Sequence, residues 1–367
     1  MRARIVLNPA AGATDFHRHL SQAVEYLEEC GWQVDQQKTR SRGDGIDLAR
    51  EAADAGYDVV IAVGGDGTIN EVVNGLAGSQ TAMGIIPAGT GNVYAADVGI
   101  PIWSPLRPMA VREAAKIIQG GQRCAIDLGR VKFSNGQQRY FFMWCGVGLD
   151  AAVTNEVTSD QTRRLGFVAW VMAGVMVAIN YLGHSSHVTV DKRRERMRML
   201  SAIISNGQLY GRVLRFAPQA KMDDGLLDLT VFEGYGILST IRHLAILLLG
   251  QNARDPTVHQ YVGQSISIKT RRPLPVHVDA EPMGTTPVQI EVVPQALTVI
   301  WPTQLPGHLL SGGGGRQGPG LFAAWSQTSD EIAQRVKAHV KLRMSEIFRG
   351  FPGTGDDEFS SRGTLDR

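Results

Sequence analysis

The chain has almost no net charge and few cysteines, and each shortage excludes a class of protein. Its 367 residues carry 37 Lys and Arg against 35 Asp and Glu, so the net charge is only +2. That balance gives no reason to expect nucleic acid as a partner. Only three cysteines are present, and they lie far apart without metal-binding spacing: Cys30, Cys124 and Cys145. Such sparse cysteines are typical of a reducing cytosol rather than a disulfide scaffold.

Two familiar phosphate-transfer signatures are also missing. The sequence contains no G-x-x-x-x-G-K-[S/T] loop and no protein-kinase catalytic loop. The N-terminus leads directly into a predicted strand, so we expect no secretory signal. What remains is an ordinary globular composition, with 43% apolar and 20% charged residues, in a chain long enough for two domains. Any phosphate site must therefore be built from other glycine-bearing segments.

Three glycine-bearing loops each follow a predicted strand. The apolar strand 57–63 runs into Gly64-Gly65-Asp66-Gly67, after which Ile69, Val72 and Val73 recur at helical spacing. Strands 83–87 and 4–7 precede the loops 88–92 and 8–12. Glycines at such turns let backbone amides approach a ligand, and helix starts favour anions. One such loop alone fits a plain strand-to-helix turn equally well, but three together predict a nucleotide site at the carboxyl ends of parallel strands.

The pattern of strands and helices divides the chain into two parts. Strands expected at 4–7, 32–37, 57–63 and 83–87 alternate with helices at 16–30, 45–55, 69–77 and 110–119, which predicts a parallel sheet covered on both faces. Short strands dominate afterwards and predict a β-sandwich, with strands at 125–132, 140–147, 186–190, 199–205, 227–232, 264–269, 275–279, 287–292 and 297–301. We expect the charged segment 191–196 to be a solvated hairpin tip, with contact to anionic lipid headgroups as the alternative.

The domain boundaries follow from these patterns. We expect an α/β domain over 1–124 and a β-sandwich domain over 125–303. The Gly-rich segment then predicts a linker over 304–328. An amphipathic helix and tail over 329–367 would follow, either lying on a membrane or docking on the protein, or else remaining a poorly ordered tail.

The ordered motifs resemble the diacylglycerol kinase catalytic domain family, which includes bacterial diacylglycerol kinases and sphingosine kinases. The resemblance covers residues 1 to about 303. It implies an α/β nucleotide-binding domain like that of NAD kinases and diacylglycerol kinases, followed by a β-sandwich domain. It also implies transfer of the ATP γ-phosphate to a hydroxyl of diacylglycerol, a sphingoid base or a related lipid. The matching segments are 8–12, 64–68, 87–92, 126–129, 205–207, 217–218, 223–228 and 278–282.

The resemblance also assigns site residues for ATP and for catalysis. Glu281 would be the general base for the lipid hydroxyl, and Asp66 would face the phosphates as the second catalytic residue. If Glu281 stood alone, an exposed turn residue would be the favoured interpretation. The residues that would contact ATP are Asn8, Pro9, Ala10, Ala11, Gly12, Thr39, Gly64, Gly65, Asp66, Gly67, Thr68, Ile69, Asn70 and Thr90.

A magnesium loop is implied in the same way. Asp224 would supply a carboxylate to a structural Mg²⁺, while Lys221 and Leu226 would supply backbone carbonyls. Asp127 would join the polar network around the cation site. An Asp-Gly turn between strands and a strand-end carboxylate are the structural alternatives.

Two residues depart from the family pattern. Ala280 stands where a glycine usually precedes the glutamate, which would be strained if that position requires a positive φ. Val93 stands where diacylglycerol kinases often carry an aspartate. The second change weakens a diacylglycerol assignment more than it weakens kinase activity.

One segment challenges an entirely soluble fold. Residues 165–182 contain no charged side chain and are close to the length that spans a bilayer. We favour a helix buried in the fold or lying at a membrane face, because Gly166, Gly174 and Asn180 interrupt the segment. With the apolar stretch 237–249, it would help to form or cover an acyl-chain site. We therefore expect a cytoplasmic enzyme that associates peripherally with membranes.

Two other functions stay open on the sequence alone. An NAD kinase shares the Gly-Gly-Asp-Gly motif and would phosphorylate a soluble nucleotide. A nucleotide-dependent lipid-binding protein without catalysis is the second alternative. The expected partners are a lipid at a membrane surface and no nucleic acid, with a homodimer as an open question.

Overall fold

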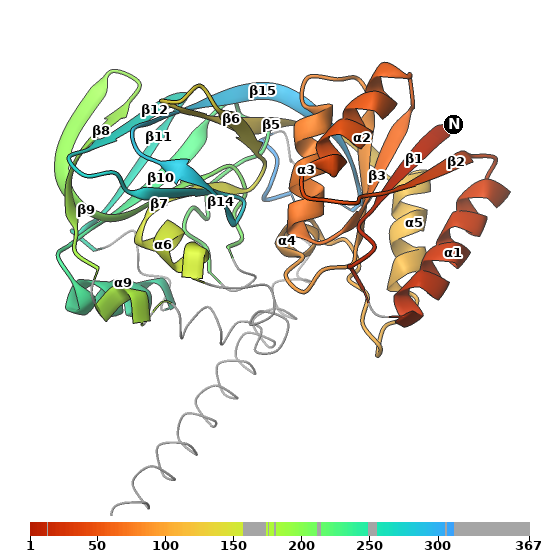
Figure 1. Ribbon diagram of the computed structural model, residues 1–367, viewed down its shortest axis with the longest axis horizontal. Helices are drawn as coiled ribbons and strands as arrows, with labels where there is room; N and C mark the ends of the chain where they lie inside the picture. The colour runs from red at the N-terminus through yellow and green to blue at the C-terminus, as the bar shows by residue number, and fades with distance from the viewer. Residues whose placement is uncertain are drawn as a thin grey trace, which may run out of the picture. The chain divides into compact units, whose positions relative to one another are not determined.

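Figure 1 presents a computed structural model of the chain. The linker after residue 311 and the expected C-terminal helix lie outside the described residues, as does most of the apolar segment 165–182. Residues Met1–Gly314 form one compact unit. The structure describes residues 1–12, 14–156, 174, 176–179, 181–210, 214–248, 255–304 and 307–311.

The N-terminal part is built on four parallel strands. Their order is β4-β3-β1-β2, because β1 pairs with both β2 and β3, and β3 pairs with β4. Two helix pairs, α1 with α5 and α2 with α3, cover the faces of this sheet (Figure 1). The elements are β1 (Arg2–Leu7), α1 (Thr14–Glu29), β2 (Gln33–Lys38), α2 (Asp44–Asp54), β3 (Val59–Gly64), α3 (Asp66–Leu76), β4 (Ala82–Pro87), α4 (Val93–Val98) and α5 (Ala110–Gly120).

Burial explains why these segments form the central layer. Every residue of β3 and β4 is buried, which suits near-continuous apolar runs in a parallel sheet. Helix α2 approaches α3 closely at Gly75, where a Cβ atom would lie 2.4 Å from the Ile46 carbonyl oxygen. The glycine therefore sets the spacing of the two helices that lie over the candidate site.

The second part consists mainly of antiparallel strands. Its own core gathers inward-facing aliphatic and aromatic side chains, among them Val131, Phe141 and Ile266. The elements are β5 (Gln122–Phe133), β6 (Gln138–Phe141), β7 (Trp144–Gly148), α6 (Leu149–Glu156), β8 (His184–Val190), β9 (Arg193–Ser205), β10 (Leu227–Glu233), α9 (Ile237–Leu248), β11 (Val258–Gly263), β12 (Ser265–Thr270), β13 (Pro275–Val278), β14 (Glu281–Thr285) and β15 (Val288–Trp301).

Strand β15 belongs to both parts. It pairs antiparallel with β12 and β5 and parallel with β4, so a single 15-stranded sheet runs through the described chain. The sequence predicted two strands here, at 287–292 and 297–301. The structure has one strand with a register shift between Val293 and Leu297. A bulge lets one strand bend, so β15 can pair with strands of both parts of the fold, which the sequence predicted to have separate sheets.

Several other boundaries differ from the prediction for local reasons. The expected strand 140–147 is two strands, because Phe142 and Met143 form a bend between β6 and β7. The charged hairpin tip is shorter than expected, since β9 already begins at Arg193. Strands β11 and β14 and the short helices α4 and α6 were not predicted. The α/β architecture with a following β-sandwich-type part is confirmed.

Candidate active site

The three glycine-bearing loops lie together at the carboxyl edge of the parallel sheet. The Asn8 side chain after β1 donates from Nδ2 to Thr68 Oγ1 in the first turn of α3, at 3.3 Å. Gly89 after β4 lies so close to Gly65 that a Cβ on Gly89 would be 2.5 Å from the Gly65 Cα. Thr39, which follows β2, donates its backbone N–H to the Leu7 carbonyl at 2.9 Å. Four strand ends thus meet at one place.

Asp66 begins α3 but does not point freely into this space. Its Oδ1 accepts the backbone N–H of Val93 at 2.9 Å, at the start of α4. Burial raises the pKa of the Asp66 carboxyl, and the N–H groups of Val93, Tyr94 and Asn92 partly offset that rise. The carboxylate therefore holds the loop 88–92 against α3, a role that sequence reasoning did not assign to it.

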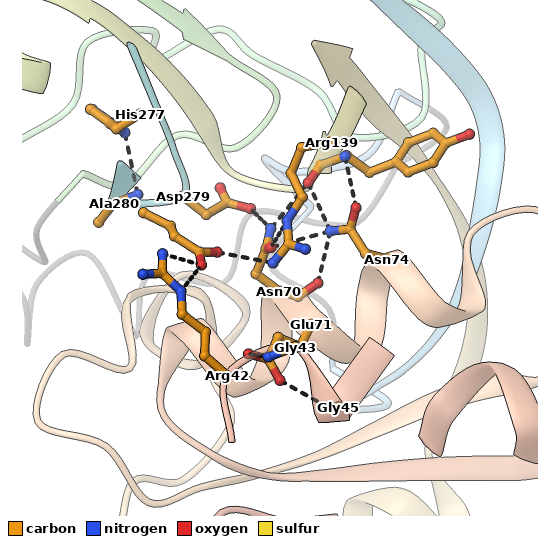
Figure 2. Close-up of polar contacts among 12 residues, drawn as sticks. Arg42, Gly43, Gly45, Asn70, Glu71, Asn74, Arg139, His277, Asp279 and Ala280 are labelled. Atoms are coloured by element: carbon orange, nitrogen blue, oxygen red, sulfur yellow. Dashed lines mark hydrogen bonds and ion pairs between the residues drawn. The ribbon is translucent and has the colours of Figure 1, made fainter. Parts of the chain in front are cut away.

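Asn70 lies one turn further along α3 and joins it to the turn between β13 and β14. Its Nδ2 donates to Asp279 Oδ2 at 2.7 Å, and its Oδ1 accepts Arg139 Nε at 3.0 Å (Figure 2). The Asp279 carboxylate also accepts the backbone N–H groups of residues 142–144, at 3.0–3.1 Å. Burial raises the pKa of Asp279 to about 6. A network of donors thus fixes this turn to α3.

Glu281 projects from the same turn between two guanidinium groups. Its Oε2 accepts Arg139 Nη2 at 2.9 Å, and its Oε1 is paired with Arg42. The Glu281 side chain is 15% exposed. Because Arg139 is also bound to Asn70, the Glu281 carboxylate is linked to the second turn of α3, whose first residue is Asp66. Asp66 and Glu281, the two residues expected to be catalytic, are thus both connected to α3: Asp66 lies in the helix, and Glu281 is joined to it through Arg139 and Asn70.

A buried histidine, His277, supports the turn between β13 and β14 through a hydrogen bond. His277 Nδ1 accepts the backbone N–H of Ala280 at 3.3 Å, so its proton lies on Nε2 and is directed to Asp150 Oδ2. Tyr210 also donates to Asp150. A Cβ on Gly146 would lie 2.1 Å from the His277 ring, so this glycine makes room for the pair.

The expected magnesium loop shows carboxylates close together. Asp127 is buried within β5, where Oδ2 accepts the Gly225 N–H at 2.6 Å and Oδ1 accepts the Gln295 N–H at 2.8 Å. Burial, followed by the charges of Asp127 and Asp223, raises the pKa of Asp224. Within the described ranges, no cluster of three or more acidic, His or Cys side chains has the geometry of a metal site. A cation here would depend on backbone carbonyls beside Asp224.

An apolar face of helix α9 is exposed to solvent. Leu238, Ile241 and Leu244 recur at every third residue and are 81%, 57% and 40% exposed. Tyr235, just before the helix, is 57% exposed. Among the helices that the structure describes, none has both the length and the apolar character to span a membrane.

Sequence reasoning missed several residues of this site. Asp279 was part of a recognised motif but received no role, and Arg42 lay unassigned beside Thr39. Arg139 carried no local signal, since a lone arginine in a strand resembles a surface residue. The position of Arg139 depends on how β6 packs against α3. There, Asn74 Oδ1 accepts the N–H of the neighbouring Tyr140 at 2.9 Å.

Comparisons with known proteins agree with this arrangement. Residues 2–131 match the diacylglycerol kinase catalytic domain, and residues 144–301 match the YegS C-terminal NAD kinase beta sandwich-like domain. Diacylglycerol kinase from Bacillus subtilis is 29% identical over 305 residues, covering 83% of this chain and 97% of that protein. Probable lipid kinase YegS from Escherichia coli is 29% identical over 291 residues, covering 78% and 92%.

A solved structure gives the same result. The crystal structure of a putative diacylglycerol kinase from Bacillus anthracis aligns with a TM-score of 0.68 and 26% identity, covering 82% of this chain and 97% of that chain. The two family models follow each other in the order of the two parts of the fold. The chain therefore belongs to the lipid kinase family defined by the diacylglycerol kinase catalytic domain.

Proposed function

We propose that this enzyme transfers the γ-phosphate of ATP to a hydroxyl of diacylglycerol or a related lipid, with Glu281 as general base. The observation that carries the proposal is the position of Glu281. Arg139, itself bound to Asn70 of α3, holds the Glu281 carboxylate, and the glycine-bearing loops meet at the start of the same helix. Relatives named diacylglycerol kinase support the acceptor class.

The nucleotide would lie across the carboxyl edge of the parallel sheet. Backbone N–H groups of the converging loops and the start of α3 would bind its phosphates. Asp66 would keep loop 88–92 in place and face a cation carried by the phosphates. The residues that we propose to line this site are Asn8, Pro9, Ala10, Ala11, Gly12, Thr39, Gly64, Gly65, Gly67, Thr68, Ile69, Asn70 and Thr90.

The transfer itself would need a proton acceptor for the lipid hydroxyl, and that acceptor would be Glu281. The lipid hydroxyl oxygen attacks the γ-phosphorus, its O–H bond breaks, and the proton passes to Glu281 while ADP leaves. Two positive groups beside the reacting carboxylate, Arg42 and Arg139, would also stabilise charge on the transferring phosphoryl group. A general base must lie within hydrogen-bond reach of the hydroxyl, and the partly buried Glu281 side chain can meet a lipid headgroup entering from the β13–β14 side.

Mg²⁺ would have a structural place as well as its usual place on ATP phosphates. We propose that Asp224 and the carbonyls of Lys221 and Leu226 hold it, with Asp127 fixing the loop through Gly225. The excess of carboxylates supports this choice, because burial and then the charges of Asp127 and Asp223 raise the pKa of Asp224, and a cation would stabilise its ionised form. When bound, the ion would supply charge neutralisation to the loop.

The lipid would reach the site from a membrane surface. The exposed apolar face of α9 is suited to contact acyl chains, and Ile179 and Leu182 add exposed apolar side chains, 59% and 45% exposed, from the segment before β8. Such a face supports peripheral association with a bilayer.

The test is Glu281→Gln, which removes the base and keeps the shape of the side chain. We expect kcat to fall by about 100-fold or more, because general base catalysis contributes on that scale. Labelled ATP would be incubated with a panel of lipids in micelles and, separately, with NAD, and new phosphate esters would be identified by mass spectrometry. The matched control is Glu291→Gln, which removes an ion-paired carboxylate of β15 outside the site.

Two results would contradict the proposal. Full activity of purified Glu281→Gln would remove the base assignment. Phosphorylation of NAD with no lipid product would favour the soluble-substrate alternative.

A further inference from the structure

The two arginines that hold Glu281 differ in how firmly they are fixed. Arg139 has a side chain only 10% exposed and is bound through Nε to Asn70, so it stays with α3. Arg42 has a side chain 67% exposed, and Glu281 is the partner of its guanidinium group. An ion pair with one exposed member contributes little to stability, so Arg42 can exchange partners readily.

The backbone beneath Arg42 is fixed. Glu71, which is 9% exposed, accepts the N–H of Gly43 at 2.8 Å and of Gly45 at 3.0 Å (Figure 2). Gly43 has φ 95°, and a Cβ on Gly45 would lie 2.6 Å from Glu71 Oε2. Glycine at both positions therefore lets the loop sit tightly on the carboxylate of Glu71. The arginine has a rigid base and a long, exposed side chain.

The loop 40–43, which carries Arg42, also lies beside the proposed phosphate site. It follows Thr39, whose backbone is bonded to the end of β1, and it leads into the start of α2. Asp44 accepts the N–H groups of Arg40 and Ser41, at 2.7 and 2.9 Å, which closes the turn. A guanidinium group favours phosphate oxygens, which it can bind through two parallel N–H bonds.

We propose that Arg42 is a positioning residue that binds Glu281 in the free enzyme and transfers to the terminal phosphate of ATP when the nucleotide binds. Oε1 of Glu281 is then freed to accept the proton of the lipid hydroxyl, while Oε2 stays bound to Arg139. The base therefore becomes available only when the phosphoryl donor is present. This inference rests on the proposed role of Glu281, and it assigns to Arg42 the coupling between nucleotide binding and catalysis.

The first experiment compares two nucleotides by calorimetry. Arg42→Ala should weaken binding of a non-hydrolysable ATP analogue by about 10- to 100-fold, the scale of a lost charge-assisted contact, and leave AMP binding unchanged. Arg42→Lys should recover part of the lost affinity, because lysine keeps the positive charge but lacks the paired N–H donors of the guanidinium group. Arg40→Ala, which removes a positive charge from the same loop, is the control and should bind both nucleotides as the wild type does.

The second experiment tests the exchange of partners. In Glu281→Gln the ion pair with Arg42 is lost, so the ATP analogue should bind several-fold more tightly than to the wild type. In the double variant with Arg42→Ala, that gain should disappear. If the gain persists in the double variant, it comes from the loss of a negative charge alone, and the exchange is refuted.

The outcomes separate this inference from the proposed function. Wild-type binding of the analogue by Arg42→Ala, together with inactive Glu281→Gln, would overturn the role of Arg42 and leave the base in place. Equal loss of AMP and analogue binding would show that Arg42 only supports the loop. Full activity of Glu281→Gln would instead overturn the base assignment, whatever the binding results.

Discussion

Ala280 occupies a backbone conformation that favours glycine. Its φ is 63°, and the preceding Asp279 has φ 45°, so both residues of the turn between β13 and β14 are left-handed. An L-residue in this region is strained by about 1–2 kcal/mol. The two angles turn Asp279 toward α3 and place Glu281 beside Arg139. This strain could be predicted from the sequence, because a glycine is usual at this position in the family.

Replacing this alanine measures the strain directly. Ala280→Gly should raise the free energy of unfolding by about 0.5–1 kcal/mol, because relief of the left-handed angle outweighs the added entropy of the unfolded chain. Urea denaturation followed by fluorescence would measure the change. Ala55→Gly, at φ −80° in an exposed position, should lower the same quantity. Equal effects of the two substitutions would argue against strain at residue 280.

At the scale of single elements, α3 organises the site. Successive polar residues of its first two turns each have a different partner: Asp66 binds α4, Thr68 binds Asn8, Asn70 binds Asp279, and Glu71 binds the loop before α2. The helix is buried on nearly every side, so its polar residues must be satisfied by the fold. One short helix therefore links three loops to the second part of the chain.

Much of this element could be predicted from the sequence, and its contacts could not. The strand, the glycines and the apolar spacing predicted a loop followed by a helix, and the convergence of three loops followed from the rule for parallel sheets. The helix began earlier than expected, at Asp66, because glycine and aspartate can form its first turn. Glu71 binds Gly43 and Gly45, 28 and 26 positions away, and Asn70 binds Asp279, 209 positions away, and no local pattern encodes these contacts.

The loop 221–226 provides a prediction for metal binding. Burial and then Asp224 raise the pKa of Asp228 to about 6. Without a cation, the stability that comes from these raised pKa values is present at about pH 4 and is lost as pH rises through 6, where the carboxylates must ionise in the fold. Mg²⁺ would offset that loss, and it would compete poorly with protons at low pH.

We therefore expect saturating Mg²⁺ to raise Tm by about 3–5 °C at pH 7.5 and much less at pH 5.5. In Asp224→Asn, Mg²⁺ should no longer raise Tm more at pH 7.5 than at pH 5.5, because the carboxylate that would bind the ion is gone. Asp47→Asn, an exposed change on α2, is the control. Scanning calorimetry with and without a chelator measures each Tm. A Tm in Asp224→Asn that still responds to Mg²⁺ as in the wild type would place the ion elsewhere.

On the scale of the whole unit, β15 joins two architectures that the sequence suggested were separate domains. Its C-terminal end covers the edge of β4, and Trp301 at that end is fully buried. The indole Nε1 donates to the Tyr94 hydroxyl at 2.6 Å. The strand thus contributes to the core of the α/β part, while its first half pairs with β12 and both its halves pair with β5. Shared strands of this kind favour unfolding of both parts in one transition.

Trp301→Ala tests that coupling. The substitution should lower the free energy of unfolding by about 3–5 kcal/mol, the scale for deleting a large buried aromatic side chain. Tyr94→Phe should lower it by about 1–3 kcal/mol, because the indole N–H is left buried without its acceptor. Native-state hydrogen exchange with mass spectrometry would give the unfolding free energy separately for peptides of β1 and β9. In each variant we expect the unfolding free energy to fall by the same amount for both peptides, since they share one sheet. A loss confined to β1 would show that the two parts unfold independently and that β15 does not couple them.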